Sequence, residues 1–311
     1  MVMKKAVVSN KAPGTRLTGG DALFNTINYL VFGLFTLACV FPFYYLFINT
    51  ISNNQASSLG DVMFFPVGFH LNNYVEVLRI RGIGRAALLS VGRTVLGTAL
   101  MVFASATCGY LFTKQQMWMR KFWYRLVVVT MYFNAGVIPW YLTMNALHLT
   151  NNFLAYILPG IVSPYNIILV KTFVESVPES LEESAQLDGA GFGVILIRII
   201  MPLIVPILAT IAIFGAVGQW NAFTDTLFLM SDAKMFTLQF LLYRYLNEAA
   251  SLAALLKSDP RLASSMDLST MQTPESVRMT VSMVVVLPIL FVYPFFQRYF
   301  VQGIMIGAVK G

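Results

Sequence analysis

The chain is organised around ESAQLDGAGFGVILIRIIMP, from Glu183 to Pro202, which lies between two strongly apolar runs. It is acidic, contains glycines and has helical character. A short polar segment between two membrane helices must lie in water, because charged groups are costly in hydrocarbon. We therefore interpret it as a docking element for a partner outside the membrane.

The composition of the chain indicates a membrane protein. Of its 311 residues, 57% are hydrophobic and 11% are charged, whereas about 25% are charged in a soluble domain. The net charge of +7 does not indicate nucleic acid as a partner. Its Lys and Arg residues occur singly or in pairs beside apolar runs, as expected from membrane topology. We therefore predict an all-α integral membrane protein in a lipid bilayer.

Six apolar runs are long enough to cross a bilayer, since a spanning helix needs about 20 residues. The polar residues 1–26 are predicted as an N-terminal tail without a secretory signal peptide. Residues 27–298 are expected to form the six-span domain, and residues 299–311 a C-terminal tail. The predicted spans are 27–49, 94–112, 123–144, 153–173, 201–221 and 277–296.

Charges in the connections predict the orientation. The N-terminal tail, the 113–122 connection and the C-terminal tail are basic, whereas the long connections 50–93 and 222–276 are mixed in sign. Short basic loops stay on the inner side. Both termini are therefore expected in the cytoplasm, and an even number of spans agrees with this.

The two long outer connections carry further expectations. Residues 62–74 are either a helix along the membrane surface or a packed loop. In the loop 222–276, we expect a helix at 236–256 and a second helix that starts with Thr273 as N-cap and Pro274 at its first position. This loop contacts a partner or gates an entrance, or it is a lid that caps the bundle.

The polar segment between the fourth and fifth spans is predicted as a short helix at about 177–190. Ser176 and Glu179 have the spacing of a capping box, and the helix would run from Glu179 to Leu187 and end at Gly189. A second helix would start near Phe192 and run into the membrane, with Pro202 at its entry. The segment is either a solvated linker helix or an acidic knob that docks into a basic cleft on a cytoplasmic protein.

The same segment resembles the signature loop of permease subunits of bacterial ABC importers. That pattern is Glu-Ala-Ala, three residues, Gly, nine residues and Ile-x-Leu-Pro. Here it reads Glu183-Ser184-Ala185, three residues, Gly189, nine residues and Ile199-Ile200-Met201-Pro202. The spacing matches throughout, and Ser184 and Met201 are modest departures from the pattern.

Further stretches resemble the carbohydrate-uptake branch of that family, which includes the maltose-type permease MalG and especially the LplC/YtcP group. The resemblance covers nearly everything from Asp21 to Gly311, and it implies the type I ABC importer permease (MetI-like) fold. The supporting stretches are residues 41–45, 136–139, 157–160, 219–221, 299–303 and 307–311.

The resemblance implies a set of partners and a mechanical role in a bacterial cell membrane. It implies a second permease subunit, usually different, two ABC ATPase subunits at the cytoplasmic face and an extracytoplasmic sugar-binding protein. Glu183 would contact the ATPase, Ala185 would pack in its cleft and Gly189 would make the turn. The predicted ATPase-coupling loop consists of Glu182, Glu183, Ser184, Ala185, Asp188, Gly189 and Pro202.

The chain has no Gly-x-x-x-x-Gly-Lys-Ser/Thr phosphate loop. We therefore expect no cofactor on this chain and expect ATP and Mg on the partner ATPase. A sugar path would need aromatic faces and hydrogen-bonding side chains within the spans. The same residues are also typical of interhelical hydrogen bonds and of interfacial anchors. The candidates are Tyr132, Asn134, Asn166, Gln219, Trp220 and Asn221.

Other classes of function fit the sequence less well. His70 and His148 are far apart, and neither His-Glu-x-x-His nor Gly-x-Ser-x-Gly occurs, so we expect no catalytic or metal site. A channel or an ion-coupled transporter would leave the docking segment unexplained, and the spans contain almost no carboxylates to couple ions. An ABC permease for a peptide or a polyamine is the closest alternative.

Overall fold

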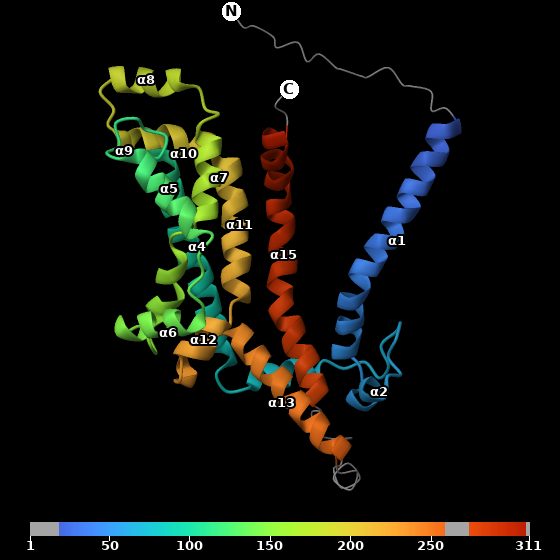
Figure 1. Ribbon diagram of the computed structural model, residues 1–311. Coiled ribbons are helices and arrows are strands. Elements are labelled where there is room, and N and C mark those ends of the chain that lie inside the picture. Colours follow the sequence, from blue (N-terminus) through green and yellow to red (C-terminus); the bar gives the residue numbers. More distant parts are fainter. Residues whose placement is uncertain (1–18, 259–273, 309–311) are drawn as a thin grey trace, which may run out of the picture.

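The computed structural model describes residues 19–258 and 274–308, and every element within these ranges is a helix (Figure 1). The centre of the bundle is α4, which packs against α7 and α11, and α11 in turn packs against α15. The longer helices are α1 (Gly19–Thr50), α4 (Ile83–Leu111), α5 (Arg120–Thr130), α6 (Val137–Ala146), α7 (Pro164–Val174), α11 (Val205–Asn221), α13 (Leu238–Ser258) and α15 (Pro274–Ala308).

Shorter helices gather at the two ends of the bundle. One end, here called the α8 end, carries α8, α9 and α10, and the opposite α13 end carries α2, α6, α12 and α13 (Figure 1). The first described turn of α1 and the last turns of α15 also lie at the α8 end. The shorter elements are α2 (Asn54–Leu59), α3 (Asn72–Arg79), η1 (Phe153–Tyr156), η2 (Leu158–Gly160), α8 (Glu179–Leu187), α9 (Phe192–Ile195), η3 (Leu196–Ile200), α10 (Met201–Leu203), α12 (Thr224–Leu229) and η4 (Ala233–Met235).

Three helices within the described residues are long and apolar enough to cross a membrane by themselves. They are Gly20–Thr50, Ile83–Leu111 and Glu275–Val292. Two bent pairs bring the total to five candidate spans if each pair counts as one: Phe153–Gly160 with Pro164–Val174, and Phe192–Leu203 with Val205–Asn221. These segments coincide with five of the six predicted spans.

The predicted third span, 123–144, is not one continuous helix. It divides into α5 and α6, which are separated by residues 131–136. The side chain of Asn134 accepts a hydrogen bond from the backbone N–H of Gly136 at 2.9 Å, and Gly136 has φ +83°. This local turn competes with helix formation, and hydrophobicity alone does not reveal it.

The ends of three predicted elements also differ. The helix α4 starts at Ile83 rather than at 94, because Arg93 is buried within the bundle instead of marking its edge. The helix α1 starts at Gly19, inside the predicted N-terminal tail, and α15 continues to Ala308, inside the predicted C-terminal tail. Residues 1–18 and 309–311 lie outside the described residues.

The fifth predicted span bends sharply at its start. Residues Phe192–Leu203 and Val205–Asn221 meet at 84°, so the helix from Phe192 lies across the bundle instead of running straight into it. Pro206 lies in the first turn of α11. A proline has no N–H to bond the carbonyl four residues earlier, and its ring clashes with that carbonyl. The bend therefore comes after Pro202, not at it.

At the α13 end, the loop alternative is confirmed for residues 62–71, which contain no helix. Backbone hydrogen bonds hold this loop to the end of α1, with the N–H of Asn53 on Val67 O at 2.8 Å and the N–H of His70 on Ile51 O at 2.9 Å. The helix predicted at 236–256 is confirmed as α13, and a helix does begin at Pro274. Thr273, its predicted N-cap, lies outside the described residues.

Candidate functional site: an exposed helix and a cavity

The polar segment forms α8 with the predicted bounds, Glu179–Leu187, but with a different N-terminus. Pro178 occupies the N-cap position and no side chain caps the helix. The Ser176 hydroxyl donates instead to the carbonyl of Phe173 at 2.6 Å, so the predicted capping box is wrong. Glu179 and Glu182 lie in the first turn, where carboxylates are favoured by the helix dipole.

The C-terminus of α8 is a Schellman motif. The N–H of Ala190 donates to the carbonyl of Ala185 at 2.9 Å, and the N–H of Gly189 donates to that of Gln186 at 3.0 Å. Gly189 has φ +81°, a conformation that glycine adopts without steric cost. The predicted glycine stop is confirmed, and it turns the chain toward α9.

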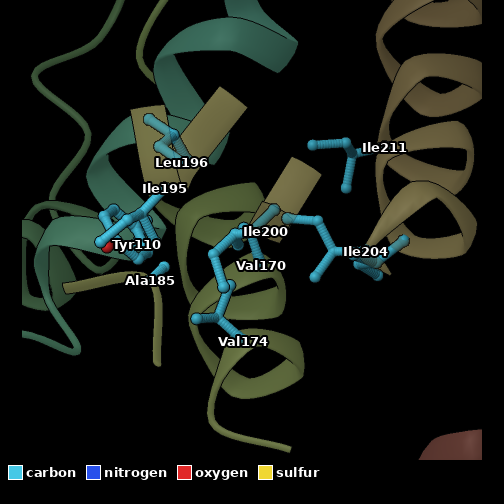
Figure 2. Close-up of a cluster of buried hydrophobic side chains, with 10 residues drawn as sticks. Tyr110, Val170, Val174, Ala185, Ile195, Leu196, Ile200, Ile204 and Ile211 are labelled. Carbon is cyan, nitrogen blue, oxygen red and sulfur yellow. The ribbon is translucent and has the colours of Figure 1, made fainter. Parts of the chain in front are cut away.

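One face of α8 packs on its own bundle. Ala185 is 9% exposed and belongs to the buried cluster shown in Figure 2, together with Tyr110, Val174 and Ile195. Its methyl group is therefore covered by side chains of this chain, and packing of Ala185 in a cleft of the ATPase stays a prediction. The contact with this buried cluster holds α8 against the end of the bundle.

A second inward contact is polar. The Lys114 ammonium forms an ion pair with the Glu182 carboxylate, and both side chains are largely buried. The Tyr110 hydroxyl donates to the same carboxylate oxygen, Oε2, at 3.3 Å. Glu182 thus faces α4 rather than the solvent.

The other face of α8 is open to solvent. Leu187 is 89% exposed and Leu181 is 43% exposed, and Glu183 and Asp188 are exposed beside them. The Ser184 hydroxyl, also exposed, donates to the carbonyl of Ser180 at 2.8 Å. Pro202 is exposed as well, but it lies in α10, separate from α8. The outer face of α8 therefore presents apolar side chains next to carboxylates.

A cavity of about 720 Å³, with a few polar side chains in a mostly apolar lining, lies among α4, η1, η2, α7 and α11. Asn166 and Gln219 line it, as do the aromatic side chains of Trp140, Tyr156 and Tyr165. A volume of this size is typical of a small-molecule site. Aromatic faces and amide groups are also the types of side chain that the sequence indicated for a sugar path.

A buried arginine closes one side of this cavity. The Arg93 side chain is 2% exposed and pairs with Asp225, with Nη2 to Oδ2 at 2.5 Å and Nη1 to Oδ1 at 3.1 Å. It also donates to Gln219 Oε1 from Nε at 3.1 Å and from Nη2 at 3.0 Å, and from Nη1 to the carbonyl of Ala222 at 3.2 Å. All five guanidinium donors are used. The guanidinium carbon also lies 4.6 Å from the centre of the Tyr156 ring.

Two of the six predicted path residues, Asn166 and Gln219, line the cavity. Tyr132 and Asn134 lie in the break between α5 and α6, and Tyr132 is 80% exposed. The Trp220 indole N–H donates to the carbonyl of Val285 in α15 at 3.0 Å. That is the interhelical role which the sequence left open. Asn221 is exposed at the end of α11 and does not line this cavity.

Sequence reasoning missed Arg93, Asp225 and Tyr156. Arg93 precedes an apolar run and was placed outside the span, and Asp225 fell in the long outer loop. Two glycines were a weak indication of where the Gln219 side chain lies. A Cβ on Gly97 would lie 2.8 Å from the Gln219 amide nitrogen, and one on Gly160 would lie 3.1 Å from it. Small residues at these positions leave room for the Gln219 amide.

A bundle of apolar helices of membrane-spanning length, with a cavity among them, is the architecture of a membrane protein and is compatible with a transport subunit. A scan against models of protein families gives no match. The Bacillus subtilis (strain 168) polygalacturonan/rhamnogalacturonan transport system permease protein YtcP is 31% identical over 291 residues, which cover 94% of this chain and 99% of that protein. Protein LplC of the same strain is 32% identical over 295 residues, which cover 94% and 97%.

A solved structure agrees with these relatives. The crystal structure of a bacterial ABC transporter involved in the import of the acidic polysaccharide alginate matches with a TM-score of 0.79 and 27% identity, over 91% of this chain and 98% of that chain. This chain belongs to the family of permease subunits of bacterial ABC sugar transporters. Its relatives are transport permeases and not enzymes.

Proposed function

We propose that this chain forms one half of the pore of an ATP-driven, binding-protein-dependent importer of a sugar or oligosaccharide. In this proposal, α8 docks on an ABC ATPase subunit and couples that subunit to the pore. The observation that carries the proposal is the outer face of α8, where Leu187 and Glu183 are exposed while the opposite face packs on the bundle.

The proposed topology has six spans, with both termini and α8 in the cytoplasm. The split pair α5 and α6 would serve as the third span. The first described turn of α1, the last turns of α15 and α8 all lie at one end of the molecule (Figure 1), which supports a common side for all three. The positive-inside rule then assigns that side to the cytoplasm of a bacterial plasma membrane.

The proposed assembly contains a second, homologous permease subunit, two ATPase subunits that carry ATP and Mg, and an extracytoplasmic sugar-binding protein. ATP-driven closure of the ATPase subunits would displace α8 and shift the bundle between inward-facing and outward-facing arrangements. Glu183 would make a charge-assisted contact with the ATPase. Leu187, on the exposed face of α8, would supply an apolar contact in addition to the one predicted for Ala185.

The cavity is the proposed sugar path. Its hydrogen-bonding groups include Asn166 and Gln219, and its aromatic rings provide faces for a sugar. Among the residues that line it, the charged groups are Arg93 and Asp225, which neutralise each other. In this arrangement Arg93 offers no free cation to an acidic sugar. The amide groups and aromatic rings of the lining are what support a sugar or oligosaccharide as the substrate class.

A charge reversal on α8 tests the proposal. The chain is purified with the products of its neighbouring genes and reconstituted in proteoliposomes with ATP. Glu183→Lys is expected to abolish ATP-driven sugar uptake while membrane insertion stays normal. Glu248→Lys, at an exposed acid of the α13 end, is the matched control and should preserve uptake. Normal uptake by the Glu183→Lys protein would show that α8 does not dock on the ATPase through this face.

A further inference from the structure

Two ion pairs hold the segment that contains helix α4 to other elements, one at Arg93 within the helix and one at Lys114, just beyond its C-terminal end. Three ion pairs among the described residues are local and join side chains three or four positions apart: Lys171–Glu175, Arg244–Glu248 and Arg278–Glu275. The two that join different elements both involve α4. Arg93–Asp225 ties it to α12, and Lys114–Glu182 ties the turn after it to α8.

The Lys114 end is built as a compact joint. Lys114 lies three residues beyond Leu111, the last residue of α4, and its N–H donates to the Leu111 carbonyl at 3.0 Å. Its ammonium lies 4.3 Å from the centre of the Tyr110 ring, and the Tyr110 hydroxyl bonds the same Glu182 oxygen. A carboxylate of α8 is therefore held by two groups that are fixed to the end of α4.

Burial makes this ion pair stronger than an ordinary surface pair. The side chains of Lys114 and Glu182 are 15% and 13% exposed, against 49% and 57% for Arg244 and Glu248. Partial removal of water strengthens the attraction between the two charges, whereas exposed pairs contribute little. Helix α8 also contacts the bundle through the apolar side chain of Ala185. Without the ion pair, α8 has fewer directional contacts with α4.

Helix α4 is suited to carry a displacement to the cavity. Its 29 residues form one continuous helix and contain no proline, the residue that most strongly kinks a helix. Tyr110 and Arg93 are 17 positions apart, which is about 26 Å along a helix. Gly97, Thr98 and Met101 of the same helix line the cavity. A movement of α4 at its Lys114 end would therefore also displace the residues of α4 that line the cavity.

We propose that the Lys114–Glu182 pair, seated on Tyr110, is the joint through which α8 moves α4 and the wall of the cavity. Glu182 is thus a positioning residue inside the permease and not a contact to the ATPase. The inference rests on the proposed function, in which α8 docks on an ATPase subunit. It predicts that, when the pair is broken, ATP is still hydrolysed but less sugar is transported per ATP.

A charge swap in the reconstituted assembly tests the joint. The wild type, Lys114→Glu, Glu182→Lys and the double swap are compared for sugar uptake, ATP hydrolysis and ATPase copurification. Each single variant is expected to lose at least about tenfold in sugar transported per ATP, while copurification stays within about twofold; tenfold corresponds to 1.4 kcal/mol of coupling. The double swap is expected to recover to within about threefold of the wild type, because it restores the pair. Glu175→Gln, which removes an exposed carboxylate paired within α7, is the matched control and should leave this ratio unchanged.

Several outcomes would overturn the joint. Single variants that keep the wild-type ratio would do so, and so would a double swap that is no better than its parents. Loss of ATPase copurification in Glu182→Lys, without rescue, would show that Glu182 contacts the ATPase itself. A wild-type chain that copurifies with no ATPase would overturn the proposed function and the joint together.

If the proteins with reversed charges do not insert into the membrane, variants with neutral side chains are used in their place. Lys114→Gln, Glu182→Gln and the double neutral variant then form a double-mutant cycle on the same ratio. Losses that are smaller in the double variant than the product of the single losses support the joint. Strictly independent losses, or no losses, overturn it.

Discussion

The Arg93–Asp225 pair gives the sharpest prediction about stability. Arg93→Met keeps the aliphatic part of the side chain and removes the guanidinium, which leaves the Asp225 carboxylate, 14% exposed, without its partner. It also leaves Gln219 Oε1 and the Ala222 carbonyl without their donor. Breaking a buried pair by removing one partner costs about 3–5 kcal/mol. For a chain of this size, we expect the melting temperature to fall by on the order of 10 °C.

The assay is thermal unfolding of the purified chain in detergent, followed by tryptophan fluorescence. Adding Asp225→Asn to Arg93→Met should recover part of the loss, because the unpaired charge is removed; coupling energies of contacting residues are about 0.5–3 kcal/mol. Arg244→Met is the matched control, since Arg244 is 49% exposed and paired within one helix. It should cost no more than about 1 kcal/mol. The reasoning is refuted if Arg93→Met costs as little as Arg244→Met, or if the Arg93 and Asp225 losses are additive.

Further predictions follow from close contacts and backbone geometry. Gly109→Ala should destabilise the chain by about 1–3 kcal/mol, since its Cβ would lie 2.9 Å from Val170 Cβ and 3.1 Å from the backbone N of Lys171. Gly84→Ala in the same helix meets nothing within 4 Å and should gain about 0.5–1 kcal/mol; equal melting temperatures for the two variants would contradict this packing. In Gly189→Ala the alanine must adopt φ +81°, at a cost of about 1–2 kcal/mol. Backbone amides at the end of α8 should therefore exchange hydrogen faster, and unchanged exchange would argue against the Schellman turn. Trp220→Phe removes the hydrogen bond to Val285 and should cost about 1 kcal/mol in thermal unfolding, whereas no loss would place the indole elsewhere.

Local signals in the sequence were sufficient to predict the bounds of α8 and the first residue of α15. A proline before the helix and an Asp-Gly pair after it set the bounds Glu179–Leu187, and Pro274 starts α15. These features act through the backbone of neighbouring residues, so they need no knowledge of the fold. The capping box failed because the Ser176 hydroxyl has a nearer acceptor in the preceding turn, the carbonyl of Phe173.

Ion pairs between residues far apart in the sequence could not be predicted from it. An arginine beside an apolar run indicates the edge of a membrane span, and only its pairing with Asp225, 132 residues later, buries Arg93 inside the bundle. The same limit applies to Glu182. Its spacing placed it in an acidic loop, but its partner Lys114 lies 68 residues away and turns it inward. Which polar side chains line the cavity depends on helix rotation, so Asn166 and Gln219 could not be separated from Trp220.

The most direct test of the central claim is a cross-link from the exposed face of α8. In an assembly whose permease has Cys39 and Cys108 replaced by alanine, a thiol-specific photo-cross-linker is attached at Leu187→Cys or at the control position Leu59→Cys. Leu59 is 70% exposed in α2 at the opposite end of the bundle. Docking of α8 on the ATPase should give a cross-link to that subunit from position 187 and none from position 59. An ATPase cross-link from position 59, or none from position 187 in a transport-active assembly, would contradict it.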